Sequence, residues 1–225
     1  MSEIVYVNQV HARAPQRLRK HSLDQVLTEL MNFGVVLVAL IFLAPVMIGV
    51  GLAIFTQDGG PVLFAHRRIG RNGRYFHCLK FRSMAIDAER RLADLLANDP
   101  AAREEWARDH KLRNDPRVTR LGAFLRKTSL DELPQLFNVL RGEMSLVGPR
   151  PIVDAEIAKY GRRFSRYCAV KPGITGLWQV SGRNDVDYRR RVALDCVYAR
   201  RRSVVMDGMI IAATVPAVLL RRGSY

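Results

Sequence analysis

The sequence predicts an α+β fold that is mostly helical, in which a small cytoplasmic domain with a short β-hairpin is anchored by a proline-kinked re-entrant membrane helix. Three observations predict this fold. Residues 33–55 form a 23-residue stretch without a charged group, two short apolar segments flank Asn72-Gly73, and apolar residues recur at helical spacing within residues 85–110.

The composition excludes several protein classes. The chain has 225 residues, of which 48% are hydrophobic, so it can bury a core and is not a disordered chain. Its three cysteines are isolated and odd in number, which excludes a disulfide scaffold and fits reduced thiols in a cytosol-facing protein. With 36 Lys and Arg against 21 Asp and Glu, the net charge is +15. That charge leaves nucleic acids, an anionic membrane surface and phosphorylated substrates as partner classes.

Among these partner classes, the charge-free stretch 33–55 favours a membrane. As a helix it would be about 34 Å long, enough to span a bilayer. Pro45 near its middle cannot donate a hydrogen bond to the carbonyl of Ile41, which predicts a bend. Basic residues on both sides pull both ends toward the cytoplasmic face. We therefore expect two half-helices that enter and leave on the same side.

A second apolar run, residues 208–220, is too short to span a bilayer and contains Pro216. Arginines flank it at both ends, so a helix lying among lipid headgroups is one interpretation. A buried core helix is the other, and the sequence does not separate them.

The remaining elements follow from local signals. The apolar segments 61–69 and 75–81 around Asn72-Gly73 predict a hairpin. Residues 85–110 predict a helix interrupted at Asp99-Pro100. A short helix is expected before residue 128, and another is expected from Ser129 to about Leu140.

The candidate chemistry centres on Asp131 and Glu132. Ser129 and Glu132 have the spacing of a helix capping box, which would place Asp131 in a first helical turn where a carboxylate is favoured. Such a pattern is usually structural. Here, however, Arg126 lies just upstream, and Arg150 lies in a Gly-Pro-Arg-Pro turn whose Gly148 would let a phosphate approach the backbone closely. A carboxylate among cations suits attack on a phosphoryl group.

Four motifs carry a resemblance to a known family. They are KFRSM at residues 80–84, TSLDELPQL at 128–136, SLVGPRP at 145–151 and KPGITGLWQ at 171–179. In order and spacing the chain resembles, from about residue 30 to its C-terminus, the bacterial sugar transferases, which are monotopic polyprenyl-phosphate phosphoglycosyl transferases. The small size, with no additional N-terminal membrane bundle, most resembles the undecaprenyl-phosphate galactose or glucose phosphotransferases that initiate exopolysaccharide synthesis.

The resemblance implies an activity. Such enzymes transfer a hexose 1-phosphate from a UDP-hexose to undecaprenyl phosphate, release UMP and form undecaprenyl-diphosphate-sugar, the first step of exopolysaccharide or capsule assembly. It also implies Mg²⁺ as cofactor, contact with membrane lipids, and the cytoplasmic face of the bacterial inner membrane as the location. Monomer and homodimer are both left open, as are galactose and glucose.

The resemblance also assigns residues and domains. Asp131 matches the nucleophile that forms an aspartyl intermediate, and Glu132 matches the second acid; both would meet the metal. The substrate-binding residues implied are Lys80, Arg126, Arg150 and Arg183. The chain then divides into a polar tail (1–28), the re-entrant membrane helix (29–57) and a catalytic domain with interfacial helices (58–225).

Two departures from the family pattern concern the membrane end. The Lys-Arg pair and Asp common before the helix are replaced here by the segment from Glu29 to Asn32, and the usual Ser-Pro break is Ala44-Pro45.

The alternative hypothesis, from another class, is a membrane-tethered nucleic-acid-binding module or a scaffold without catalysis. Because the motifs match an enzyme family, we expect no nucleic acid partner.

Overall fold

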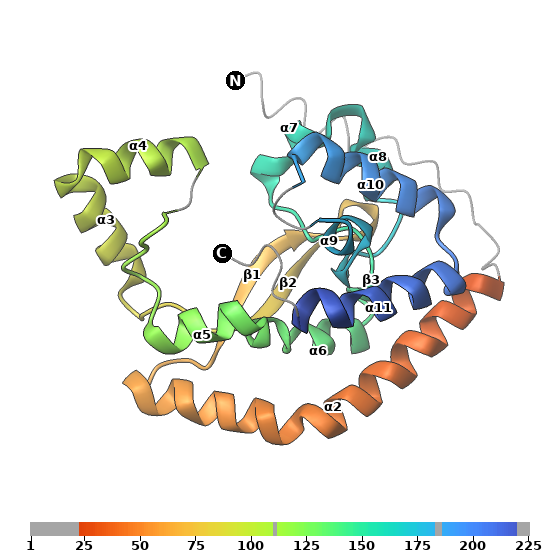
Figure 1. Cartoon of the computed structure of the whole chain (residues 1–225), viewed down its shortest axis with the longest axis horizontal. Coiled ribbons are helices and arrows are strands. Elements are labelled where there is room, and N and C mark those ends of the chain that lie inside the picture. Colours follow the sequence, from red (N-terminus) through yellow and green to blue (C-terminus); the bar gives the residue numbers. More distant parts are fainter. Residues whose placement is uncertain (1–22, 110–111, 183–185, 220–225) are drawn as a thin grey trace. The chain divides into compact units, whose positions relative to one another are not determined.

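The computed structural model describes residues 23–109, 112–182 and 186–219 (Figure 1). These residues form two compact units. The first unit comprises the described residues up to Leu43, Ala65–Leu79 and those from Gln135 onward; the second comprises Ala44–Phe64 and Lys80–Pro134.

The long apolar segment forms one helix, α2 (Leu23–Asp58), with Pro45 inside it. We expected two half-helices, and the structure does not show that break. A proline removes one backbone donor and disturbs one turn, while the flanking apolar residues continue the helix on both sides. The helix is long and apolar enough, by length and composition, to cross a membrane. That both of its ends face the cytoplasm stays a prediction.

The predicted hairpin is confirmed. Strands β1 (Leu63–Ile69) and β2 (Tyr75–Phe81) pair as a two-stranded sheet, joined by the 3-10 turn η1 (Arg71–Gly73). Asn72 and Gly73 both have positive φ angles, 59° and 72°. These are the residue types that adopt left-handed backbone with least strain, so the turn signal in the sequence has a direct structural cause.

The second unit contains helices α3 (Ala88–Asn98), α4 (Pro100–Asp109) and α5 (Arg120–Thr128). The break between α3 and α4 falls at Asp99-Pro100 as predicted, and the Asp99 carboxylate accepts a hydrogen bond from the Ala102 N–H at 3.0 Å. Thr119 caps α5 by accepting from the Gly122 N–H at 2.9 Å. The core of this unit forms around the buried side chains Ile54, Phe81 and Leu125.

The single helix expected from Ser129 to Leu140 is wrong. Ser129 ends α5 with a left-handed φ of 58° and makes no side-chain cap, so the capping box with Glu132 does not form. A 3-10 turn, η2 (Leu130–Glu132), follows, and α6 (Gln135–Leu140) begins only after Pro134. Two physical causes separate the elements: the αL residue reverses the chain, and Pro134 lacks a backbone donor.

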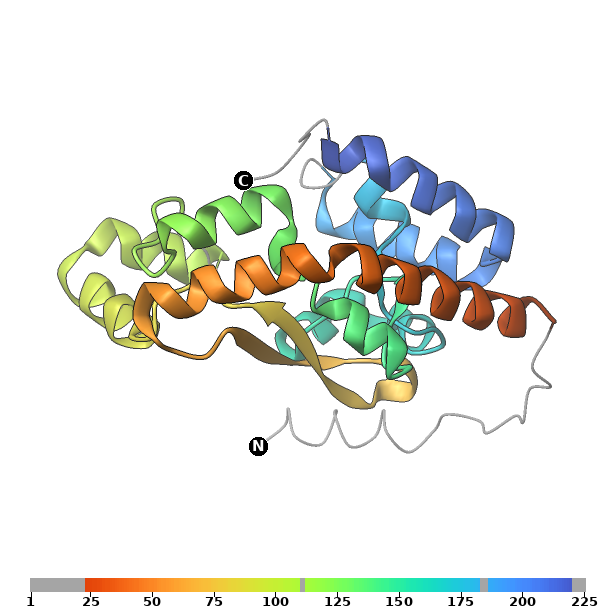
Figure 2. The ribbon, with the colours of Figure 1, turned by 90° about the horizontal axis from the view of Figure 1, so that it is seen from below.

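The first unit is built around short elements from distant parts of the chain. Strands β3 (Ser145–Val147) and β4 (Gly173–Thr175) pair in parallel, with Ser145 opposite Gly173. Around them lie η3 (Asp154–Glu156), α7 (Ile157–Tyr160), η4 (Gly161–Arg163), α8 (Phe164–Tyr167), α9 (Leu177–Val180), α10 (Tyr188–Arg201) and α11 (Val204–Leu219). Helices α9, α10 and α11 lie side by side in Figure 2. The N-terminal part of α2 enters this unit, where Val36 is fully buried in one cluster with Leu136 and Val139.

Helix α11, which contains most of the second apolar run, is two-faced. Ile210 is buried in a cluster with Val147 and Tyr198. On the other face Val205, Met209 and Val215 are more than half exposed. The two interpretations left open by the sequence therefore each describe one face: core packing on one side, and an exposed apolar stripe of the kind found in interfacial helices on the other.

Candidate active site

The predicted acid pair and a predicted cation meet in the second unit. Asp131 and Glu132 lie in η2, immediately after the left-handed Ser129, and Lys80 lies near the end of β2. The Lys80 ammonium donates to Glu132 Oε1 at 2.7 Å and lies 3.9 Å from Asp131 Oδ2, beyond hydrogen-bond distance. The lysine thus holds Glu132 directly and acts on Asp131 mainly as a nearby positive charge.

Asp131 is the buried member of the pair. It is only 7% exposed, whereas the side chains of Lys80 and Glu132 are each about a quarter exposed. Burial raises the pKa of Asp131, and the Glu132 charge raises it further, while Lys80 and Arg126 oppose the rise. A desolvated carboxylate held among cations is a stronger nucleophile than one in water, because it has less hydration to lose.

Arg126 reaches the same motif region from α5. Its Nε donates to the Ser83 hydroxyl at 2.9 Å. Helix α5 lies directly on this segment: a Cβ at Gly122 would come within 1.9 Å of the Ser83 carbonyl oxygen. The glycine therefore allows the close approach of α5 to residues 80–84. Two of the four sequence motifs, 80–84 and 128–136, are brought together by this packing.

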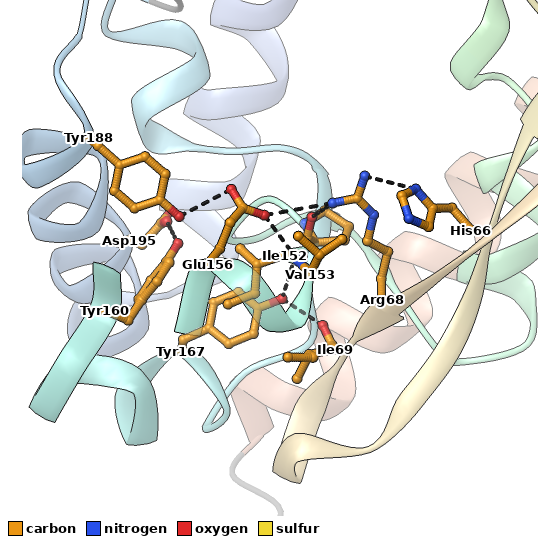
Figure 3. Close-up of polar contacts among 11 residues, drawn as sticks. His66, Arg68, Ile69, Ile152, Val153, Glu156, Tyr160, Tyr167, Tyr188 and Asp195 are labelled. Atoms are coloured by element: carbon orange, nitrogen blue, oxygen red, sulfur yellow. Dashed lines mark hydrogen bonds and ion pairs between the residues drawn. The ribbon is translucent and has the colours of Figure 1, made fainter. Parts of the chain in front are cut away.

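Arg150 belongs to the first unit and is exposed. The segment after it is anchored by the polar contacts shown in Figure 3. Arg68 donates to the Pro151 carbonyl at 3.2 Å, and Ile69 and Ile152 are joined by a backbone hydrogen bond of 3.0 Å. Burial and the nearby Arg150 both lower the pKa of Arg68. The proline-flanked arginine is thus presented from a rigid support.

The same network continues into the core of the first unit. Glu156 accepts from the Val153 N–H at 3.0 Å and from the Tyr188 hydroxyl at 3.2 Å. The Tyr160 hydroxyl donates to Asp195 at 2.7 Å (Figure 3). Burial raises the pKa of Asp195 to about 7. Sequence reasoning missed all of these residues, since isolated tyrosines and acids on short helices form no pattern.

Two residues of the sequence motifs, Trp178 and Gly148, have packing roles. Trp178 is 4% exposed and stacks under the Arg191 guanidinium at 4.6 Å, so it packs in the core. At Gly148, a Cβ would meet the backbone of residues 171–173 within 2.5–2.9 Å. The space expected to admit a phosphate is filled by the protein's own chain, and the glycine serves the close packing of the two motifs 145–151 and 171–179. Arg183 lies outside the described residues.

Among the described residues, Asp131 and Glu132 are the candidate donors for a metal ion. In the described part of the chain there is no group of three or more His, Cys, Asp or Glu side chains that could hold an ion. Mg²⁺, however, is commonly bound by one or two carboxylates together with substrate phosphates and water. Asp131 and Glu132 fit that kind of site, which is completed by substrate.

Comparison with known proteins gives consistent relatives. Residues 23–221 match the family described as bacterial sugar transferase. The undecaprenyl-phosphate galactose phosphotransferase of Salmonella typhimurium is 54% identical over 83% of this chain and 39% of its own length. An uncharacterized sugar transferase of Haemophilus influenzae is 48% identical over 99% of this chain and 45% of its own.

A shorter relative matches over most of both chains. The exopolysaccharide production protein ExoY of Sinorhizobium fredii is 52% identical over 85% of this chain and 84% of its own. The chain thus spans less than half of the first two relatives and most of the third. A family match over nearly the whole described chain, with the motif residues assembled as above, leads to one conclusion: this chain is a member of the bacterial sugar transferase family.

Proposed function

We propose that the chain transfers a hexose 1-phosphate from a UDP-hexose to undecaprenyl phosphate and so initiates exopolysaccharide or capsule assembly. The observation that carries the proposal is the buried Asp131 carboxylate beside Glu132, with Lys80 bridging the pair. The relatives' names support the substrates: they specify undecaprenyl phosphate, galactose, glucose and a UDP-galactose-lipid carrier reaction.

In the first step, an Asp131 oxygen attacks the β-phosphorus of the donor. The bond from that phosphorus to the oxygen bridging the two phosphates breaks, UMP leaves with the electron pair, and the hexose phosphate stays on Asp131 as an acyl phosphate. Lys80 and Arg126, whose charges act on Asp131, are proposed to balance negative charge as it shifts onto the leaving UMP. Arg150 and Arg183 are proposed to bind the same donor.

In the second step, a phosphate oxygen of the lipid attacks the phosphorus held on Asp131. The acyl phosphate bond breaks, the Asp131 carboxylate is regenerated, and the product is the diphosphate-linked lipid sugar. Glu132, fixed by Lys80 at 2.7 Å, keeps a second negative charge at the site.

Asp131 and Glu132 would hold Mg²⁺ together with the donor phosphates. When bound, the ion neutralises phosphate oxygens so that an anionic nucleophile can approach. Chelation of Mg²⁺ is expected to abolish turnover, and the affinity of the chain for Mn²⁺, measured by electron paramagnetic resonance, should fall in Glu132→Gln.

The apolar helix α2 is proposed to anchor the chain on the cytoplasmic face of the membrane with both ends on that side. Thr28→Cys and Gly59→Cys test this topology. Neither cysteine should react with an impermeant maleimide added to intact spheroplasts, and both should react after lysis. Labelling of either site from outside would show that α2 spans the membrane.

The experiment that tests the function uses radiolabelled UDP-galactose and UDP-glucose with membranes containing undecaprenyl phosphate. The label should move into the lipid extract, and UMP should be released. With donor alone, a trace of label should stay bound to the protein and be absent in Asp131→Asn. No transfer from either donor, together with tight binding of nucleic acid, would favour the alternative of a nucleic-acid-binding module.

A further inference from the structure

A polar pocket in the first unit lies outside the site described above. It has a volume of about 480 Å³, within the range of ligand pockets. Its walls come from the first turns of α2, the hairpin turn η1, the loop before β4 and the junction of α10 with α11. No residue of the second unit lines it, so it shares no side chain with the Asp131 site.

The pocket carries excess positive charge. Its basic lining residues are Arg71, Lys171, Arg200 and Arg202, and its acidic ones are Glu29 and Asp207. Glu29 is already paired with Lys171 at 3.1 Å. Asp207 is 2% exposed and lies 2.8 Å from the Tyr198 hydroxyl, and burial raises its pKa to about 6. With Glu29 paired to Lys171, the charges of Arg71, Arg200 and Arg202 stand against that of Asp207, so the lining has a net positive charge.

Arg71 points to the kind of ligand. Its Nε is buried and has no hydrogen-bond partner among the described residues. A buried guanidinium nitrogen without an acceptor is costly, and guanidinium groups pair best with phosphate and carboxylate oxygens. Because Arg71 lines the pocket, an anion there would pair with the same guanidinium group.

The surroundings favour a lipid over a soluble anion. The polar residues of α2 that line the pocket, Gln25 to Asn32, directly precede its charge-free stretch. The other helix at the rim, α11, starts at the pocket and exposes the apolar stripe of Val205, Met209 and Val215. We propose that the pocket binds the phosphate of an anionic phospholipid headgroup, with the acyl chains beside these apolar surfaces.

The test uses the purified full-length chain with Arg71→Gln and a matched control, Arg74→Gln, an exposed arginine three residues away that does not line the pocket. Native mass spectrometry from neutral detergent measures retained phosphatidylglycerol, and calorimetry measures inorganic pyrophosphate. The wild type and Arg74→Gln should retain phosphatidylglycerol saturably. Arg71→Gln should weaken this binding roughly tenfold, as expected for loss of a charge-assisted pair.

Each other outcome overturns the proposal. Loss of pyrophosphate binding alone in Arg71→Gln would assign the pocket to a soluble phosphate. Equal lipid binding by Arg71→Gln and Arg74→Gln would remove the pocket as a site. If Arg71→Gln melts at a lower temperature than the wild type, lipid binding is measured with Arg200→Gln instead, because Arg200 is exposed at the end of α10. Full retention of lipid by Arg200→Gln would then refute the proposal. Hexose transfer is measured separately, so failure of the proposed function leaves this result readable.

Discussion

Two buried aspartates, Asp131 in the second unit and Asp195 in the first, differ in what surrounds them. Both are less than 8% exposed, and burial raises the pKa of each. Asp195 accepts a 2.7 Å hydrogen bond from the neutral hydroxyl of Tyr160. Asp131 instead faces a lysine at 3.9 Å that is hydrogen-bonded to Glu132. Asp195 also has a charged neighbour, Arg191, but among the described residues no second acid beside it that shares a lysine. We therefore propose that the acid and lysine next to Asp131, rather than burial alone, distinguish the reactive carboxylate.

The largest expected effect separates the two aspartates by activity. Asp131→Asn should lower hexose phosphate transfer by more than about 10³-fold, because the amide cannot form the acyl phosphate. Asp195→Asn should retain transfer within about tenfold of wild type, since it keeps the Tyr160 hydrogen bond and its volume. Transfer is measured as labelled lipid product. Substantial activity in Asp131→Asn would refute the assignment of the nucleophile.

Arg150 tests whether a cation supplied by the first unit serves the same chemistry. Arg150→Ala should lower turnover by about 10²–10³-fold, the usual loss for an electrostatic donor to a transition state. Arg162→Ala, another exposed arginine of the first unit, is the matched control and should change it little. If Arg150→Ala kept more than roughly a tenth of wild-type activity, well short of that loss, Arg150 would have no place at the reacting phosphates.

The sequence predicted the elements with strong local signals and missed those decided by packing. Asn72-Gly73 and Asp99-Pro100 placed a turn and a helix break correctly because these residues restrict or permit backbone angles by themselves. Ser129 fitted a capping box equally well, but its left-handed φ is imposed by the end of α5, which no local pattern reports. Gly148 faces backbone rather than a ligand for the same reason.

The residues of the candidate site show the same difference between what local motifs predict and what packing decides. Asp131, Glu132 and Lys80 could be grouped from their motifs, and the structure brings them together. Arg68 lies in the basic run after the apolar stretch, and its burial against the Pro151 carbonyl is not indicated by that run. Asp195 and the pocket beside Arg71 depend on residues far apart in the chain. Their juxtaposition is a property of the fold alone.

The stability of the protein should depend on pH through Asp195. Its pKa of about 7 in the fold lies above the unfolded value near 3.8, so its contribution to stability is fully present below about pH 4. That contribution is lost as the pH rises through about 7. Between pH 4 and 8, the free energy of unfolding of Asp195→Asn should fall by roughly 2–4 kcal/mol less than that of the wild type. Thermal melts in detergent at both pH values measure this, and parallel curves for the two proteins would contradict it.

The finest test of the comparison uses the charges around Asp131. The rate of UMP release from donor alone should fall at low pH as Asp131 becomes protonated. Because Lys80 holds the pKa of Asp131 down and Glu132 raises it, Lys80→Met should move the acid limb to higher pH and Glu132→Gln to lower pH. Arg126→Met should move it in the same direction as Lys80→Met, by less. Lys127→Met, exposed on the same helix, should leave the midpoint unchanged.

Because the readout is the midpoint of the acid limb and not the rate, a general loss of activity cannot imitate these shifts. Shifts in one direction for both Lys80→Met and Glu132→Gln would mean that the titrating group is not Asp131.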